Sequence, residues 1–354
     1  NLQNRDLKWE TNKSTNIGAD FALFRNKLTG SLNYFNNKTK GLLITKEVPP
    51  SAGVNDPILN VGTISNKGIE LELTYNYTRN DWNIGITGSV THIKNEVVKL
   101  AQPDQTLYGT GLKFGTDHIP TQTKEGTEIG AFYLYTADGI FQSDAEAAAY
   151  VNKDGDPLQP DAKAGDIRFV DSNGDGVIDE NDKTYKGSGF PKLEYGLNVS
   201  INYKNFDFTA FFQGVSGNKI YNGYRFELEG MDAGRNFLTS TLNAWTPQNT
   251  NTDMPRAILA DPNGNNREST RFLENGGYLR MKLLQLGYTL PASATNFAKL
   301  NRVRFYVAAQ NLFTITKYSG LDPEVGTFNP LNTGVDRALY PQNKRWLVGL
   351  QIGL

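Results

Sequence analysis

The chain of 354 residues contains no cysteine and only two histidines, His92 and His118. The lack of cysteine excludes a disulfide scaffold and a metal site built on thiolates. The scarcity of histidine argues against a histidine-based catalytic triad or zinc site. The sequence also lacks the G-x-S-x-G, P-loop and H-E-x-x-H motifs. We therefore expect no enzymatic activity.

The charge and hydropathy of the chain narrow its class further. Acidic and basic residues nearly balance, with a formal net charge of -1, so nothing favours a nucleic-acid partner, which would require a basic patch. No apolar run of about 18 residues is present that could form a transmembrane helix. Membrane-spanning strands stay open as a possibility, because their alternating pattern gives only a weak hydropathy signal.

Apolar and polar residues alternate along much of the chain. In the stretch GIELELTYNYT (68–78), Ile69 and Leu71 share one face, and Glu70 and Glu72 share the other. This period of two predicts strands with one apolar and one polar face. The alternation changes phase near Leu283, which predicts a β-bulge. The predicted strands cover approximately 17–23, 28–34, 69–77, 82–90, 193–203, 206–212, 279–290, 303–309 and 346–354.

Short and long connections alternate strictly between these nine strands. Such alternation is typical of a transmembrane antiparallel β-barrel, with short turns on the periplasmic side and long loops outside. A soluble β-sandwich, with its polar face in water, is the alternative. Tight turns are predicted at 25–27, 78–81 and 204–205, with a longer one at 291–300; long connections are predicted at 46–60, 99–189, 217–277 and 317–343.

The length of the strands and the aromatic residues at their ends also favour the barrel over the sandwich. Aromatic residues lie at strand ends, where they suit a bilayer interface. Bacterial barrels built from one chain have even strand numbers, and an open sheet would expose unpaired edges to lipid. We therefore expect additional strands, most simply from residues of the same polypeptide preceding Asn1. The aromatic residues at strand ends are Phe24, Trp82, Phe206, Tyr288 and Trp346.

The stretch VDSNGDGVIDEND (170–182) carries oxygen-bearing side chains at every second position. It fits the D-x-[DN]-x-[DN]-G calcium loop, with Gly176 at the sixth position, where the chain turns sharply. A solvated turn rich in Asx and glycine residues is the alternative. We predict a structural Ca²⁺ site whose ligands are Asp171, Asn173, Asp175, the backbone carbonyl of Val177, Asp179 and Asp182.

The predicted loop 99–189 contains more than this calcium-type sequence. Residues 143–152 predict a short helix, with Ser143 and Glu146 as a capping box. We expect this loop and the loop 217–277 to be extracellular.

Several stretches, taken in order, resemble the C-terminal barrel portion of SusC/RagA-type TonB-dependent outer-membrane transporters. The resemblance covers essentially the whole chain 1–354, and its specificity comes from the ordered set of motifs. The stretches include NRDLKWETNKSTNIGADFALFRNKLTGSLNYF (4–35), ISNKGIELELTY (64–75), IGAFYLYTADGIFQS (129–143), GDIRFVDSNGDGVIDENDK (165–183), YLRMKLLQLGYTLP (278–291) and FYVAAQNLFTITKYSGLDPEV (305–325).

This resemblance implies a large plugged barrel of about 22 strands, of which this chain would supply nine. It implies an importer of glycans or peptides in the outer membrane of a Gram-negative, Bacteroidetes-like cell. The implied partners are a SusD-like surface lipoprotein, outer-membrane lipid, and TonB, contacted through the part of the protein preceding Asn1. Two other functions stay open: a SusC-like barrel that acts as a scaffold in a larger membrane complex, and a secreted calcium-dependent carbohydrate-binding protein.

Overall fold

The computed structural model describes residues 7–45, 53, 58–102, 104–112, 118–231, 236–296 and 299–354. Within these ranges the main sheet has ten strands, all paired antiparallel, and β19 (Thr314–Thr316) joins it by pairing with β17. The other nine lie side by side in chain order: β1 (Thr11–Leu23), β2 (Leu28–Lys40), β5 (Gly62–Arg79), β6 (Trp82–Leu100), β13 (Leu193–Tyr203), β14 (Phe206–Ser216), β17 (Tyr278–Thr289), β18 (Arg302–Gln310) and β21 (Arg345–Gly353).

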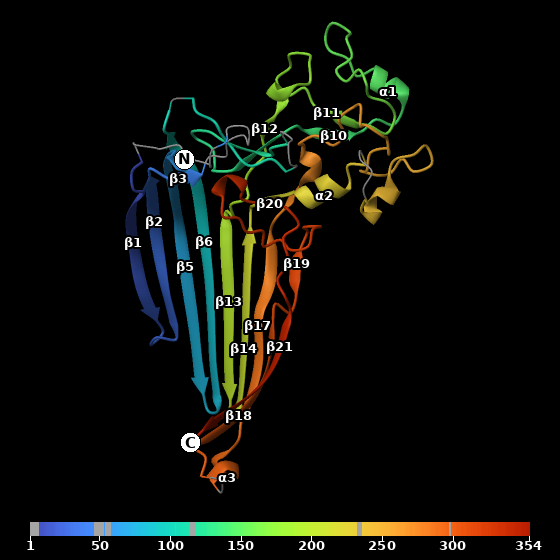
Figure 1. Cartoon of the computed structure of the whole chain (residues 1–354). Helices are drawn as coiled ribbons and strands as arrows, with labels where there is room; N and C mark the ends of the chain where they lie inside the picture. The colour runs from blue at the N-terminus through green and yellow to red at the C-terminus, as the bar shows by residue number, and fades with distance from the viewer. Residues whose placement is uncertain are drawn as a thin grey trace.

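This sheet confirms the predicted all-β, antiparallel barrel portion with nine long strands. It is open, because among the described strands β1 pairs only with β2, and β21 only with β18. The long strands connect two ends of the sheet that differ in their connections (Figure 1). The tight turns and the C-terminus lie at one end, called here the turn end. The N-terminus and the long connections lie at the other, the loop end.

The predicted tight turns are also confirmed. Phe24, Arg25 and Asn26 connect β1 to β2 with φ of 55°, 57° and 65°, and Asn80 and Lys204 adopt φ of 51° in the next two turns. The short helix α3 (Ala292–Thr295) lies in the connection between β17 and β18. The predicted bulge is present too, because the register between β14 and β17 shifts where Phe211 and Phe212 face Leu283 and Met281.

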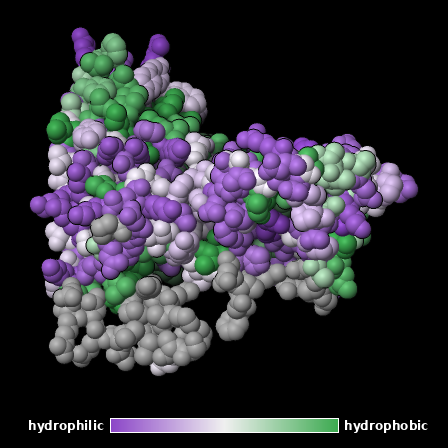
Figure 2. Space-filling model, turned by 90° about the horizontal axis from the view of Figure 1, so that it is seen from above, coloured by the Kyte–Doolittle hydropathy of each residue, from purple (hydrophilic) through white to green (hydrophobic). Residues whose placement is uncertain are grey.

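The connections at the loop end form small sheets of their own, and hydrophilic residues cover much of this end when it is viewed from above (Figure 2). The strands concerned are β3 (Leu43–Thr45) with β4 (Ile58–Asn60); β7 (Leu107–Tyr108), β8 (Thr121–Thr123), β9 (Ala131–Leu134) and β12 (Thr184–Tyr185); β10 (Ala137–Ile140) with β11 (Ile167–Phe169); and β15 (Lys219–Asn222) with β16 (Leu273–Asn275) and β20 (Val335–Asp336).

The helices in these loops are short: α1 (Asp144–Ala148), α2 (Gly223–Leu228) and the 3-10 turns Glu180–Asp182, Thr239–Asn243, Thr270–Phe272 and Pro330–Asn332. None of the helices in the described part of the chain has the length and apolar character needed to cross a bilayer. The capping prediction for α1 is only half right. Ser143 accepts from the Glu146 amide, but the Glu146 carboxylate accepts from the amide of Gln142 instead of that of Ser143.

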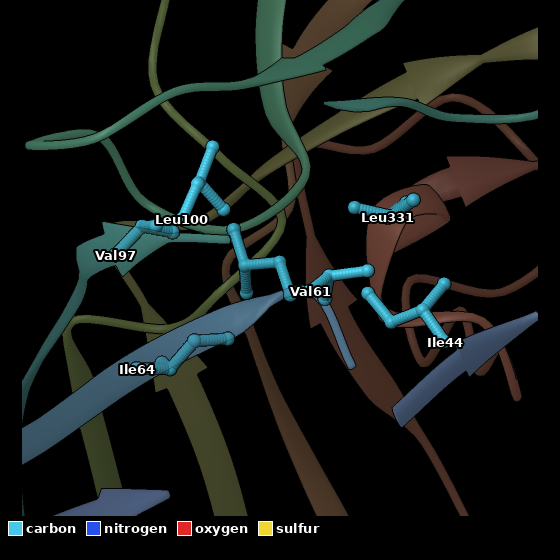
Figure 3. Packing of buried hydrophobic residues seen from close by; sticks show 7 residues of the cluster. Ile44, Val61, Ile64, Val97, Leu100 and Leu331 are labelled. Atoms are coloured by element: carbon cyan, nitrogen blue, oxygen red, sulfur yellow. The ribbon is translucent and has the colours of Figure 1, made fainter. Parts of the chain in front are cut away.

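The main apolar clusters lie at the loop end and join different connections. In one cluster, Val61, Ile64 and Val97 from the strand ends pack with Ile44 of β3 and Leu331 (Figure 3). A second cluster joins β9, β15, α2 and β20 through Phe132, Leu134, Tyr221, Phe226, Phe272 and Val335. Burial of a large apolar side chain contributes about 1.5–3 kcal/mol, so these clusters hold the connections together as one packed layer.

The two faces of the main sheet differ sharply. Directly paired residues share a face, and the row Ile17, Tyr34 and Ile69 is apolar and exposed. This face, called here the outward face, continues across the sheet to Val307 and Val348, which are 52% and 87% exposed. A sandwich would bury such a face against a second sheet. The exposed apolar face therefore argues against the soluble alternative.

Aromatic side chains cluster where the strands meet the turns. The rings of Trp82 and Tyr203 stack at 4.2 Å between centroids, and those of Phe206 and Tyr288 lie 4.7 Å apart. Phe24 is exposed in the first turn, whereas Trp346 lies at the loop-end start of β21. All five aromatic residues singled out from the sequence are thus at strand ends.

Candidate functional site

The face opposite the apolar one is polar along the middle of the sheet. Glu70 and Glu72 of β5 share it with Asn198 of β13, as their register across β6 requires. Thr74 and Thr87 face each other there, with 2.9 Å between their hydroxyl oxygens. The main sheet therefore has a polar face opposite its apolar outward face.

A charged cluster ties the connection 317–343 to the polar face of β17. The Arg280 guanidinium donates to Asp322 at 2.5 Å, to Glu324 at 2.7 Å and to Thr314 at 2.8 Å. Lys282 donates to both carboxylate oxygens of Glu324, at 2.9 and 3.1 Å. Arg280 is only 2% exposed. The connection is therefore held against the sheet by charge-assisted hydrogen bonds.

The protonation of Asp322 follows from these contacts. Burial raises the pKa of its carboxyl. The backbone amides of Gln342 and Glu324 and the Arg280 guanidinium outweigh this effect and lower the pKa below its ordinary value. Asp322 therefore stays ionised and keeps its pair with Arg280 at neutral pH.

A second ion pair bridges three strands near the turn end. Asp207 of β14 accepts from Arg304 of β18, with 2.8 Å between Nε and Oδ1, and the intervening strand presents Gly287. A Cβ at position 287 would lie 2.4 Å from the Asp207 carboxylate and 2.5 Å from the Arg304 guanidinium. Glycine at this position leaves the space that the ion pair occupies.

Buried polar contacts lock the two largest loops together. Asp166 is fully buried and accepts two hydrogen bonds of 2.8 Å from the guanidinium of Arg256. It also accepts from the Asn265 side chain at 2.9 Å, while Asn263 and Gln159 donate to the Ile167 carbonyl. The contacts made by Arg256, Asn263 and Asn265 join residues 90 to 99 positions apart, so the loop 99–189 and the loop 217–277 form one unit.

The aromatic residues of this unit serve packing. Trp245 is 8% exposed and donates from its indole nitrogen to Gln142 at 3.1 Å, and Tyr221 is fully buried in the second apolar cluster. Tyr224 lines an open depression with Arg225 and Glu229. Trp245 and Tyr221 are thus buried in the packing, whereas Tyr224 lies at the edge of this depression.

The candidate calcium residues all lie in one compact loop that follows β11. Asp171 accepts from the backbone amides of Gly174 and Gly176 at 2.7 and 2.9 Å. The Asn173 side chain donates to the Asp175 carboxylate, and its oxygen accepts from the backbone amide of Asp175. Gly176 has a φ of 89°, which confirms the sharp turn expected at the sixth position.

The C-terminal half of this loop is organised by Asp182. Its carboxylate is fully buried and accepts from the amides of Ser172 at 2.7 Å and Asp179 at 2.8 Å. Asp179 caps the 3-10 turn Glu180–Asp182, and the side chain of Val177 points into solvent with 58% exposure. Asp182 thus closes the loop from the twelfth position.

The loop has the donor chemistry of a calcium site without the arrangement of a formed one. Among the residues that the structure describes, no group of three or more His, Cys, Asp or Glu side chains converges as a metal cage. Within the same residues, the carboxylates of Asp171, Asp175, Asp179 and Asp182 form no ion pair with a basic side chain. Carboxylates keep free lone pairs while accepting amide hydrogens, so these residues fit a hard cation chemically.

Sequence reasoning missed the charged clusters. The strands were recognised by their apolar alternation, which gives no weight to the charged residues Arg280, Arg304 and Asp207. Their charge at polar-face positions was the signal that could have indicated ion pairs. Asp166 and Arg256 lie in different loops, and no local pattern links them.

Comparison with known proteins agrees with this architecture. Residues 1–155 match the family model described as TonB dependent receptor-like, beta-barrel. TonB-dependent receptor P3 of Formosa agariphila is 35% identical over 358 residues, covering 99% of this chain and 34% of the relative. TonB-dependent receptor SusC of Bacteroides thetaiotaomicron is 28% identical over 356 residues, covering 99% of this chain and 32% of SusC. The chain thus spans about a third of the length of these curated relatives.

Solved structures show the same relationship. The structure of the RagAB peptide transporter matches with a TM-score of 0.77 and 25% identity, over 99% of this chain and 36% of that one. These relatives are named receptors and transporters and not enzymes. The resemblance drawn from the sequence motifs is confirmed: residues 1–155 match the TonB-dependent receptor β-barrel family model, and 99% of the chain is similar to part of relatives of the SusC/RagA type.

Proposed function

We propose that this chain forms part of the wall and the outer loops of a TonB-dependent importer in the outer membrane of a Gram-negative bacterium. The observation that carries the proposal is the sheet with opposite faces. One face exposes apolar side chains suited to lipid, and the other presents Glu70, Glu72 and Asn198 to a wet interior. Strands of a transport barrel need both surfaces at once. The loop 99–189 and the loop 217–277 then lie outside the cell.

The proposed cargo is a glycan or a peptide, taken up with a SusD-like surface lipoprotein. The support comes from the relatives, since one is named SusC and another is described as a peptide transporter. The proposed energy source is TonB, contacted through the part of the protein that precedes Asn1. The packed layer at the loop end is the surface on which such a lipoprotein would dock.

Uptake by whole cells tests this proposal. Strains with and without the gene for the full protein would receive fluorescent oligosaccharides and oligopeptides of matched size. We expect uptake of one class to depend on the gene and on TonB. Unchanged uptake of both classes, with other envelope proteins co-purifying with the barrel, would favour the scaffold function instead.

We also propose that residues 171–182 bind a structural Ca²⁺. The support is the ordered set of oxygen donors at Asp171, Asn173, Asp175, Val177, Asp179 and Asp182, together with the unpaired carboxylates of the loop. Four carboxylates close together repel one another unless a cation lies among them. A hard cation with six to eight oxygen ligands would remove that repulsion and fix the loop.

Chelation provides the test of the calcium site. EGTA should increase the protease sensitivity of the loop 99–189 in the wild-type protein, and added Ca²⁺ should reverse the effect. Asp175→Ala should be protease-sensitive with or without EGTA. The control Asp161→Ala changes an exposed residue of the loop 99–189 that lies outside residues 171–182, and it should behave as wild type. Identical sensitivity of the wild-type loop in Ca²⁺ and in EGTA would count against a bound ion.

A further inference from the structure

Six exposed lysines gather on the outward face of the sheet, close to the loop end. They come from four consecutive strands, β1, β2, β5 and β6. The pairing register puts them in three adjacent rows with few other charges. The rows are Thr15, Asn36, Lys67 and Lys94; then Lys13, Lys38, Ser65 and Glu96; then Thr11, Lys40, Thr63 and Lys99. These twelve residues are called here the lysine patch.

Two pairs of these lysines face each other across paired strands. Lys13 faces Lys38 directly across the β1–β2 pair, and Lys67 faces Lys94 across the β5–β6 pair. Like charges directly opposite on neighbouring strands destabilise a sheet, because their Cβ atoms lie only about 5 Å apart. The single acid within the three rows is Glu96, whose carboxylate lies 2.8 Å from the Lys94 ammonium. Most of the positive charge therefore has no partner in the patch.

The patch begins where the apolar outward face ends. The next row toward the turn end contains Ile17, Tyr34, Ile69 and His92. Residues two apart on a strand are separated by about 7 Å, so the first lysine row lies one such step beyond the apolar boundary. In a membrane this position is the level of the lipid headgroups.

Protection of a sheet edge does not explain these lysines. Lysine on an edge strand discourages pairing with another chain. However, β2, β5 and β6 are each paired on both sides. Five of the six lysines therefore stand on strands that have no open edge to protect: Lys38, Lys40, Lys67, Lys94 and Lys99.

We propose that the lysine patch is a binding site for the phosphate-bearing headgroups of anionic lipids in the membrane leaflet at the loop end. Phosphate oxygens bridging ammonium groups would turn the repulsion between Lys13 and Lys38 into attraction and would add a partner for Lys67. The long apolar stems of lysine suit the boundary, since they lie along apolar surface while the charge reaches the headgroups. This inference rests on the proposed membrane position of the barrel.

Lipid retention by the full protein in detergent micelles tests the site. The probes are dioleoyl phosphatidic acid, dioleoyl phosphatidylcholine and inorganic phosphate, with bound lipid counted by native mass spectrometry. The variant is Lys67→Gln with Lys94→Gln, and the matched control is Lys153→Gln with Lys163→Gln, two exposed lysines of the loop 99–189. We expect the variant to bind phosphatidic acid about tenfold or more weakly, with the control and phosphatidylcholine binding unchanged.

Other outcomes overturn the inference in distinguishable ways. Equal retention of phosphatidic acid by the variant and the control would show that the patch is not a lipid site. Full displacement of the lipid by millimolar inorganic phosphate would assign the patch to free phosphate. Flotation of the same preparations with phosphatidylcholine vesicles separates these results from failure of the proposed function: a protein that does not float at all would contradict the membrane barrel itself.

Discussion

Replacing Asp166 by alanine should loosen the two large loops without unfolding the barrel. Asp166 is fully buried, and its two 2.8 Å bonds to Arg256 and the 2.9 Å bond from Asn265 would all be lost. Removing one partner of a buried ion pair typically costs about 3–5 kcal/mol, because the other charge is left without compensation. Since about 1.4 kcal/mol corresponds to a tenfold change, local opening should increase at least about a hundredfold.

Amide hydrogen exchange measures this opening residue by residue. The informative amides are those of Ile167, bonded to the Asn265 side chain at 2.7 Å, and Arg256, bonded to the Gly165 carbonyl at 2.8 Å. Arg168→Gln is the matched control, because its pairs with Asp138 and Glu146 are partly exposed and such pairs contribute about 1 kcal/mol or less. Strand amides of β13 and β14 should keep their protection in both variants.

Two results would refute this reasoning. Protection of the Arg256 amide could fall by less than threefold, or it could fall equally in the Arg168 control. A double variant provides a second test. Amide hydrogens of the loops should exchange more slowly in Asp166→Ala combined with Arg256→Leu than in Asp166→Ala alone, because the double variant leaves no unpaired buried charge.

Two further predictions concern the sheet and the pH dependence. Gly287→Ala should disrupt the Asp207–Arg304 pair and lower the unfolding temperature in detergent, whereas Gly88→Ala, where an added Cβ meets no atom within 4 Å, should change it little; equal effects would contradict the steric argument. Burial raises the pKa of Glu274, but hydrogen bonds from Ser319, Asn222 and Arg225 outweigh burial and leave the pKa below the ordinary 4.5. Its stabilising contribution is therefore present above that ordinary value and is lost as the pH falls through the lowered pKa. Thermal unfolding of the loops between neutral pH and about pH 3 should show this loss in the wild type and less of it in Glu274→Gln, and identical profiles would contradict it.

The sequence was sufficient to predict the long strands. Alternation such as that of Ile69 and Glu70 depends only on the pleat of a strand, which places successive side chains on opposite faces. The phase change at Leu283 predicted the bulge for the same reason. The compact loop 171–182 was also predictable, because its hydrogen bonds join residues close in the chain, such as Asp171 with Gly176.

The layer at the loop end was not predictable in the same way. Its contacts join residues far apart in the chain, as between Thr121 and Leu331 or between Asp166 and Arg256. No periodic pattern encodes such pairs, and single polar residues in loops suggest solvent exposure when read locally. The lysine patch shows an intermediate case. Each lysine was visible in the sequence, but only the register of β1, β2, β5 and β6 brings Lys13 against Lys38 and Lys67 against Lys94.

The most direct test of the central claim is a cysteine scan along β5 in native outer membranes. The chain has no cysteine of its own, so single substitutions from Ile69 to Asn76 can be labelled with a water-soluble maleimide, after replacement of any cysteine elsewhere in the protein. If β5 is part of a membrane barrel, the maleimide should react with cysteines that replace the polar-face residues Glu70, Glu72, Thr74 and Asn76. Lipid should shield cysteines that replace the outward-face residues Ile69, Leu71, Leu73 and Tyr75. Equal reaction at all eight positions would contradict the barrel.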